Sequence, residues 1–304
     1  MPDTVIALDI GGTKVAGAVV DRQGMLLRRE QVATNAAAGP YTLMATIIAL
    51  ATRLRDAFPG VAAIGVGSAG QIDHLTGRVI YANQHLPGWT GMEIGRRLGA
   101  ALALPVAVDN DVNAMALAEV THGAGKGRRV VIVAAVGTGI GGAIVLDGHL
   151  FRGASGVAGE LGHIPLAAAG PRCVCGNRGC LESYATGPRI AAAYARAAGL
   201  ERPIALPEVV TRALNGDKAA HLAFARAGER IGRALAGLVN TLNPDAIIIG
   251  GGVMAAGDLL LPPLRAALRR HSLGPACSAV VALPAALGTD AGLIGAALLA
   301  RQRE

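Results

Sequence analysis

A short segment between Glu160 and Glu182 holds most of the residues in this chain that bind metal ions readily. It offers one imidazole and three thiols as ligands: His163, Cys173, Cys175 and Cys180. One nitrogen and three sulfur ligands on a loop rich in glycine suit a closed tetrahedral Zn²⁺ site. The chain has four cysteines in all, so three of them in one segment favour a metal site over unrelated thiols. We expect a structural zinc that fixes the loop and lets both glutamates point at a polar ligand.

The N-terminal segment has the pattern of a phosphate-binding turn. Residues 4–10 are predicted to form an apolar strand that includes Asp9, and a second strand is predicted at residues 15–20. Between them lie two adjacent glycines, a hydroxyl and an amine: Gly11, Gly12, Thr13 and Lys14. Adjacent glycines let the backbone approach a phosphate, and a carboxylate beside such a turn is a place where Mg²⁺ is held. Asp9 therefore makes the pattern more specific than a simple glycine hairpin.

Two later glycine turns extend this pattern. A β-branched strand at residues 130–136 leads into Gly137, Thr138 and Gly139, and a strand returns at residues 143–146. The same order of strand, turn and strand at two places predicts a duplicated fold that holds a nucleotide between its halves. A third turn follows a strand at residues 245–249 and is the expected adenine and ribose platform: Gly250, Gly251 and Gly252.

A polar junction follows a short strand at residues 105–108 and begins a predicted helix that ends near residue 120. It contains two acids and two amides, whereas capping a helix needs one such side chain. A carboxylate at the end of a strand can accept a proton from a substrate hydroxyl. We expect Asp111 to be that base and Asn110 to position a sugar beside it.

Length and composition predict a compact protein of two domains. The chain has 304 residues, of which 52% are hydrophobic and 3% aromatic, so small aliphatic side chains must fill its cores. The apolar stretch at residues 130–146 is broken by glycines, and the N-terminus lacks the pattern of a signal peptide. These features and the three clustered thiols predict a cytoplasmic protein without membrane contact. Cys277 is expected to be a buried structural thiol.

The net charge of +7 does not by itself predict nucleic-acid binding. The arginines are scattered in ones and twos without interleaved aromatic residues, which indicates solvated surfaces. A modest positive field favours a polyphosphate substrate instead. Further helices are expected at residues 41–58, 92–102, 187–198, 219–242 and 291–300, and further strands at 26–33, 61–66 and 78–81. The single tryptophan, Trp89, is expected to be a surface anchor for the helix at 92–102.

Taken together, the segments DIGGTK, VDNDVNA, VGTGIGG, ELGH, CVCGNRGC and IIIGGGV resemble, in this order, the ROK family of bacterial sugar kinases. The resemblance spans nearly the whole chain. It implies a two-domain α/β fold of the actin-like, ribonuclease H-like type, with a cleft for sugar and ATP between the domains. The implied domains are residues 1–109 with a C-terminal helix at about 290–304, and residues 110–289 with the zinc loop. It also implies a homodimer or a dimer of dimers.

The resemblance assigns a role to each motif. Asp9 and the turn 11–14 match the first phosphate motif, and the turn 137–139 matches the second. Asp111 matches the base that takes the proton of the sugar 6-hydroxyl. Residues that match positions holding sugar hydroxyls are Asn110, Glu160, His163 and Glu182, with His163 also a zinc ligand. In the loop at residues 83–89, either Asn83 or His85 contacts the sugar. The implied cofactors are ATP with Mg²⁺ and a structural Zn²⁺.

For the substrate, the resemblance favours glucose, with N-acetylmannosamine and then N-acetylglucosamine as alternatives. Many members have proline before a glycine where this chain has Ala69 before Gly70, and the smaller side chain leaves room for an acetyl group. A repressor of the same family carries a winged helix-turn-helix ahead of the first glycine motif, and eight residues before Asp9 leave no room for one. A non-catalytic sugar or nucleotide sensor is the remaining alternative.

Overall fold

The computed structural model describes residues 3–302, which form two five-stranded sheets of the same design. Their strand orders are β3-β2-β1-β4-β7 and β10-β9-β8-β11-β12. In each sheet an antiparallel hairpin is extended by two parallel strands. The first sheet contains β1 (Thr4–Ile10), β2 (Lys14–Asp21), β3 (Leu26–Ala33), β4 (Ile64–Ser68) and β7 (Val106–Asn110). The second contains β8 (Val130–Val136), β9 (Ile140–Leu146), β10 (His149–Leu150), β11 (Ala246–Gly250) and β12 (Val281–Pro284). The predicted duplication is confirmed.

The chain divides into two compact units that are each built from separate segments. The first contains the described residues up to Lys126, Gly148–Ala158 and the described residues from Leu287 onward. The second contains Gly127–Asp147 and Gly159–Ala286. This division differs from the predicted boundary at residue 109, because α3 (Asp111–Thr121) packs against α10 (Ala291–Arg301) of the first unit.

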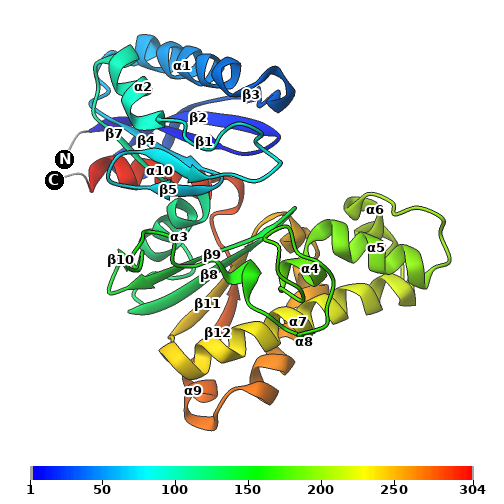
Figure 1. The fold of residues 1–304 in the computed structure, drawn as a ribbon. Coiled ribbons are helices and arrows are strands. Elements are labelled where there is room, and N and C mark those ends of the chain that lie inside the picture. Colours follow the sequence, from blue (N-terminus) through cyan, green and yellow to red (C-terminus); the bar gives the residue numbers. More distant parts are fainter. Residues whose placement is uncertain (1–2, 303–304) are drawn as a thin grey trace. The chain divides into compact units, whose positions relative to one another are not determined.

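Helices cover both faces of the sheet in the first unit (Figure 1). On one face α1 (Pro40–Ala57) packs on β1 and β2 and α2 (Ile94–Leu102) packs on β7, and Leu43 and Ile47 of α1 join Ile6 in one core. On the other face α10 brings small residues against β1 and β2. The approach is close, since a Cβ at Gly65 would lie 1.7 Å from the carbonyl oxygen of Ala296. A separate hairpin, β5 (Gln71–Asp73) with β6 (Arg78–Tyr81), follows β4.

The core of the second unit lies between its sheet and a group of helices. Ile132 and Ile247 from the strands meet Phe224, Leu235 and Leu264 from the helices. The helices are α4 (Glu182–Ala185), α5 (Gly187–Ala197), α6 (Leu206–Leu214), α7 (Lys218–Leu242), α8 (Gly257–His271) and α9 (Gly274–Ala279). Short 3₁₀ helices lie at Ala36–Ala38, Leu161–His163, Gly252–Ala256 and Gly288–Asp290. None of the helices within residues 3–302 is long and apolar enough to cross a membrane.

Trp89 corrects the expectation of a surface anchor. Its side chain is 1% exposed, and its indole Nε1 donates a hydrogen bond to Ser68 Oγ at 3.2 Å. Leu86 and Trp89 turn inward from a polar loop and pack in the core that Leu43 of α1 also joins. Burial of a large ring whose N–H has a partner is favourable, so the tryptophan anchors the loop from inside.

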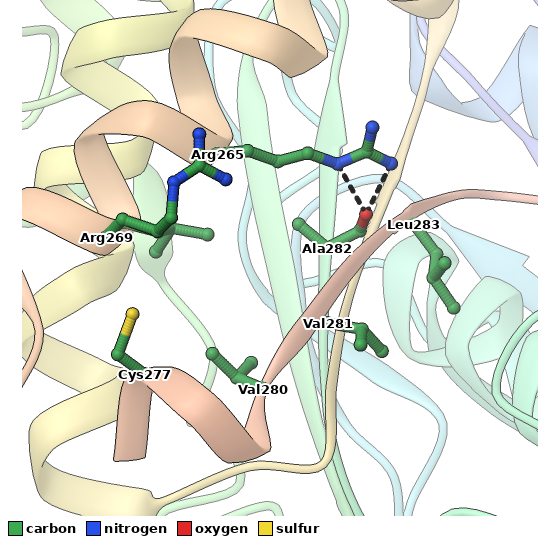
Figure 2. Close-up of a pocket in the computed structure, with 8 residues that line it drawn as sticks. Arg265, Arg269, Cys277, Val280, Val281, Ala282 and Leu283 are labelled. Atoms are coloured by element: carbon green, nitrogen blue, oxygen red, sulfur yellow. Dashed lines mark hydrogen bonds between the residues drawn. The ribbon is translucent and has the colours of Figure 1, made fainter. Parts of the chain in front are cut away.

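Cys277 was expected to be buried, but it is half-buried and lines a pocket of about 310 Å³. The pocket lies between α8, α9 and β12, and none of the predicted site residues lines it. At its wall Arg265 donates from Nε and Nη2 to the carbonyl oxygen of Ala282, at 3.0 and 2.7 Å (Figure 2). This contact covers a carbonyl of an edge strand, which would otherwise be free to pair with another chain.

Candidate active site and metal centre

The first glycine turn connects β1 to β2 and is held by Thr34. The hydroxyl of Thr34 donates to the carbonyl oxygen of Gly11 at 2.6 Å, and its backbone N–H donates to the carbonyl of Thr13 at 3.0 Å. Gly12 and Lys14 are exposed at the turn. A Cβ at Gly12 would approach the Cβ of His85 to 3.2 Å, so the predicted sugar loop lies beside the turn.

Asp9 lies in β1 next to this turn, in a confined environment. A Cβ at Gly292, in the first turn of α10, would lie 2.8 Å from Asp9 Oδ2, so only glycine leaves room for the carboxylate there. Burial raises the pKa of Asp9, and the positive charges of Lys14 and Arg29 oppose that shift. A cation bound at this carboxylate would offset the cost of its burial, as expected of a residue that helps to hold Mg²⁺.

The junction between β7 and α3 is built by the side chains on either side of Asp111. Asn110 is the N-cap of α3, and its Oδ1 accepts hydrogen bonds from the backbone N–H groups of Val112 and Asn113, at 2.8 and 3.2 Å. Its Nδ2 donates to the carbonyl of Gly70 at 2.9 Å. Asn110 is therefore the side chain of this segment that caps the helix, and its contact with a sugar stays a prediction.

Asp111 is the first residue of α3 and remains partly exposed. Its Oδ1 accepts a hydrogen bond from the backbone N–H of Val112 at 2.9 Å. Burial raises the pKa of Asp111 to about 6, and the negative charge of Asp9 adds to the rise. A carboxylate with a pKa near 6 is ionised at neutral pH and still basic enough to accept a proton. The structure thus places both predicted acids of the first unit in one electrostatic environment.

The second glycine turn and the end of the zinc segment meet within the second unit. Glu182 begins α4, and its Oε2 accepts a hydrogen bond from the backbone N–H of Ile140 at 3.0 Å. The backbone N–H of Gly187, at the start of α5, donates to the carbonyl of Gly137 at 2.9 Å. The turn 137–139 is therefore held from two helices of its own unit, and Glu182 has one oxygen committed to it.

In the third glycine turn, the backbone requires glycine at residue 251. Gly251 has a φ of 87°, and a Cβ there would lie 2.4 Å from the carbonyl oxygen of Val136. Any side chain would therefore collide with β8. At Gly252 a Cβ would meet nothing within 4 Å. The nucleotide platform at residues 250–252 stays a prediction.

The four predicted metal ligands converge. The ligand atoms of the cluster all lie within 4.8 Å of one another: His163, Cys173, Cys175 and Cys180. Cys175 Sγ and Cys180 Sγ are 3.7 Å apart, and Cys173 Sγ is 3.5 Å from His163 Nδ1. Zn–S and Zn–N bonds of about 2.3 and 2.0 Å at tetrahedral angles require about 3.8 Å between two sulfurs and about 3.5 Å between sulfur and nitrogen. The donor set and its spacing thus fit zinc.

The second nitrogen of His163 faces Glu160. The distance from His163 Nε2 to Glu160 Oε2 is 3.8 Å, longer than a direct hydrogen bond. When Nδ1 binds a metal, Nε2 carries the proton and becomes a donor. A sugar hydroxyl between the two side chains would accept a hydrogen bond from His163 and donate one to Glu160.

In the loop after β6, Asn83 has a local role. Its Oδ1 accepts a hydrogen bond from the backbone N–H of His85 at 3.0 Å, and both side chains are exposed. The structure leaves both residues accessible to a ligand. The predicted site residues thus fall in both units: Asp9, the turn 11–14, Asn83, Asn110 and Asp111 in the first, the remaining ones in the second.

Similarity to known proteins extends over nearly the whole chain. Residues 5–303 match the sequence pattern of the ROK family. Glucokinase from Streptomyces coelicolor is 38% identical over 320 residues, covering 98% of this chain and 97% of that protein. N-acetylmannosamine kinase from Shigella flexneri is 34% identical over 301 residues and 98% of both chains.

Among solved structures, a ROK family glucokinase from Streptomyces griseus in complex with glucose and AMPPNP superposes with a TM-score of 0.87. It is 35% identical, and the match covers 98% of this chain and 99% of that chain. The fold is therefore the two-domain actin-like fold of ROK sugar kinases. The family match, the relatives and the clustered ligands lead to one conclusion: this chain belongs to the ROK family.

Proposed function

We propose that this protein is an ATP-dependent hexose kinase that phosphorylates the 6-hydroxyl of glucose. The observation that carries the proposal is Asp111, a partly exposed carboxylate whose pKa is raised to about 6 at a strand end. It shares its unit with the glycine turn of β1 and β2. Kinases in the family, among them the Streptomyces coelicolor glucokinase, support the same activity.

In the proposed reaction Asp111 takes the proton of the 6-hydroxyl as the sugar oxygen attacks the γ-phosphorus of ATP. The bond between the γ-phosphorus and the bridging oxygen breaks, and ADP leaves with the electron pair. Phosphoryl transfer depends mainly on positioning and charge neutralisation. The backbone N–H groups of the turns at residues 11–14 and 137–139 and the Lys14 amine would supply donors to the phosphates. Bound Mg²⁺ would add neutralising charge at the phosphates, and Asp9 would help to hold it.

The zinc segment would form the sugar side of the site. Zn²⁺ bound by His163, Cys173, Cys175 and Cys180 would fix the loop that carries Glu160 and Glu182. His163 and these two glutamates would then hold vicinal hydroxyls. Asn83 or His85, and Asn110, would contribute from the first unit.

N-acetylmannosamine is a second candidate substrate, with N-acetylglucosamine after it. The relative from Shigella flexneri and the small Ala69 before Gly70 support it. A homodimer or dimer of dimers and a cytoplasmic location complete the proposal, the latter because three zinc-bound thiols suit a reducing compartment.

Sugar-dependent ADP formation tests the proposal, with glucose, mannose, N-acetylmannosamine and N-acetylglucosamine compared as kcat/KM. We expect glucose to be the best substrate and its product to be the 6-phosphate, identified by NMR. A pocket built around an acetyl group would disfavour glucose by about tenfold to two-hundredfold. Absence of turnover with every sugar, in folded protein that carries zinc, would overturn the kinase proposal in favour of a non-catalytic sensor.

A further inference from the structure

Asp109 and Arg152 form a nearly buried ion pair beside the proposed base. Arg152 donates from Nε and Nη2 to Asp109 Oδ2, at 2.9 and 2.8 Å. The side chain of Asp109 is 3% exposed and that of Arg152 is 25% exposed. The other oxygen, Asp109 Oδ1, accepts from the backbone N–H of Asn110 and from Asn113 Nδ2, each at 2.7 Å. Of the four hydrogen bonds described for the Asp109 carboxylate, two come from Arg152 and two come from residues on either side of Asp111.

These contacts hold the backbone on both sides of Asp111. The peptide N–H of Asn110 lies before it, and the side chain of Asn113 lies in the turn of α3 that follows it. The Asp111 carboxylate accepts from the backbone N–H of Val112 at 2.9 Å, and the side chain of Asn110 also interacts with it. Its position is therefore set by the residues of this junction, which Asp109 holds in turn.

Arg152 reaches this junction from a distant part of the sequence. It lies in the segment 148–158 of the first unit, which precedes the zinc segment in the chain. A planar guanidinium that donates from two of its nitrogens to one carboxylate oxygen restricts both the distance and the orientation of its partner. A single pair thus fastens the segment to the strand end that carries the proposed base.

We propose that Arg152 and Asp109 are positioning residues that hold the Asp111 carboxylate for proton transfer. The proposal rests on the proposed function, since it assumes that Asp111 is the base. Reactions that depend on alignment lose about a hundredfold in rate when a reacting group is misplaced by about 1 Å. Loss of the pair should therefore lower kcat more than it changes the binding of ATP.

The experiment compares Arg152→Ala and Arg152→Lys with the wild-type enzyme. We expect kcat to fall about tenfold to a hundredfold in Arg152→Ala, with the KM for ATP changed less than about threefold. Lysine keeps the charge but cannot donate from two coplanar nitrogens to Asp109, so the kcat of Arg152→Lys should lie between those of Arg152→Ala and the wild type. Methylguanidinium should restore part of the kcat of Arg152→Ala, whereas sodium chloride at equal ionic strength should not.

Arg301→Met is the matched control in the same unit. Arg301 is 8% exposed and donates from Nη2 to the carbonyls of Val20 and Asp21, at 3.1 and 2.6 Å. Asp21 pairs with Thr4, at the opposite end of the hairpin from the glycine turn. This variant should lose thermal stability while its folded fraction keeps the wild-type kcat.

Wild-type kcat in both Arg152 variants, with only a lower Tm, would overturn the proposal. If Arg152→Ala does not fold, kcat of folded Arg152→Lys decides alone, and a wild-type value there rejects the positioning role. Asp111→Asn distinguishes a failure of the base assignment from a failure of the positioning role. If that variant is active, the base assignment fails; if it is inactive while the Arg152 variants turn over normally, only the positioning role fails.

Discussion

The Oε2 atom of Glu182 accepts a hydrogen bond from the backbone N–H of Ile140 at 3.0 Å, directly after the second glycine turn. A Cβ at Gly139 would lie 2.9 Å from the same oxygen, so glycine is required there for the acid to reach the backbone. One side chain therefore links the segment that carries the metal ligands to a turn predicted to bind phosphate. Removal of this side chain should therefore weaken the binding of both sugar and ATP.

Two substitutions of Glu182 separate these effects. Glutamine keeps an oxygen that can accept from Ile140 but loses the negative charge, so Glu182→Gln should raise the KM for sugar and leave the KM for ATP nearly unchanged. Glu182→Ala removes the acceptor, and both KM values should rise. The loss of a hydrogen bond to a charged group, about 1.5–3 kcal/mol, corresponds to about tenfold to a hundredfold in kcat/KM for the sugar. Equal KM values for ATP in the two variants would contradict the link.

Asp111→Asn should remove most turnover while sugar binding stays nearly intact. An amide keeps the shape of the carboxylate but does not accept a proton at neutral pH. Turnover comes from steady-state assays and sugar affinity from calorimetry. Sugar-dependent ATP turnover within a few-fold of wild type would exclude Asp111 as the base.

The decrease of kcat/KM at acid pH should report the protonation of Asp111. Burial and the charge of Asp9 raise the pKa of Asp111 to about 6, so the group becomes protonated as the pH falls through that value. A protonated base cannot accept the hydroxyl proton, and kcat/KM should drop about tenfold per pH unit below about 6. The check is kcat/KM for the sugar from pH 5 to 9 at constant ionic strength. A flat profile down to pH 5 would contradict it.

Asp111→Asn should also make the protein more stable at neutral pH. The pKa of Asp111 is raised from 3.8 to about 6, so ionisation is harder in the folded chain than in the unfolded one. The resulting penalty is absent below the unfolded value, grows between it and about 6, and is complete above that. Replacing the carboxylate should therefore raise the free energy of unfolding by about 1–3 kcal/mol at pH 8. Urea denaturation at pH 8 and near pH 4 tests this, and an equal gain at both would exclude the electrostatic origin.

Removal of one thiol from the metal cluster should lower stability and sugar affinity together. We expect about one Zn²⁺ per chain, because the four ligands form a single closed site. Cys175→Ser should lose zinc, unfold at a lower temperature and bind sugar more weakly. Cys277→Ser is the matched control, since this thiol lies outside the cluster. An enzyme that is fully active and free of zinc after purification without added metal would exclude the structural role.

Much of the fold was predictable because its signals are local. The strands β1, β3, β6 and β8 have the predicted bounds, and α5, α7 and α10 differ from theirs by one residue. Periodic apolar residues and glycine turns determine these elements over short distances. The metal ligands were equally predictable from the sequence, since three of the four lie within residues 173–180.

Other features depend on partners far apart in the sequence. Arg152 and Asp109 are separated by 43 positions, and no motif joins them. Trp89 lies in a loop, and its burial depends on Ser68 at the end of β4, which gives its indole a hydrogen-bond partner. The helix α8 contains Pro262 and Pro263, which argue against a helix locally. Packing against α7 stabilises the helix nevertheless. The two helices approach closely, since a Cβ at Gly232 of α7 would lie 2.3 Å from the carbonyl oxygen of Leu264 in α8.

The position of α10 determines when the first unit can be completed during synthesis. The strands of the first unit emerge from the ribosome early. Helix α10, which covers Val5, Ala7 and Ala18, is translated after every segment of the second unit. Until then one apolar face of that sheet has no cover, which is a state prone to aggregation. The second unit can therefore fold first, while the nascent first unit depends on chaperones or on fast completion. Premature stop codons anywhere before α10 should consequently yield insoluble chains, even when every predicted site residue has been made.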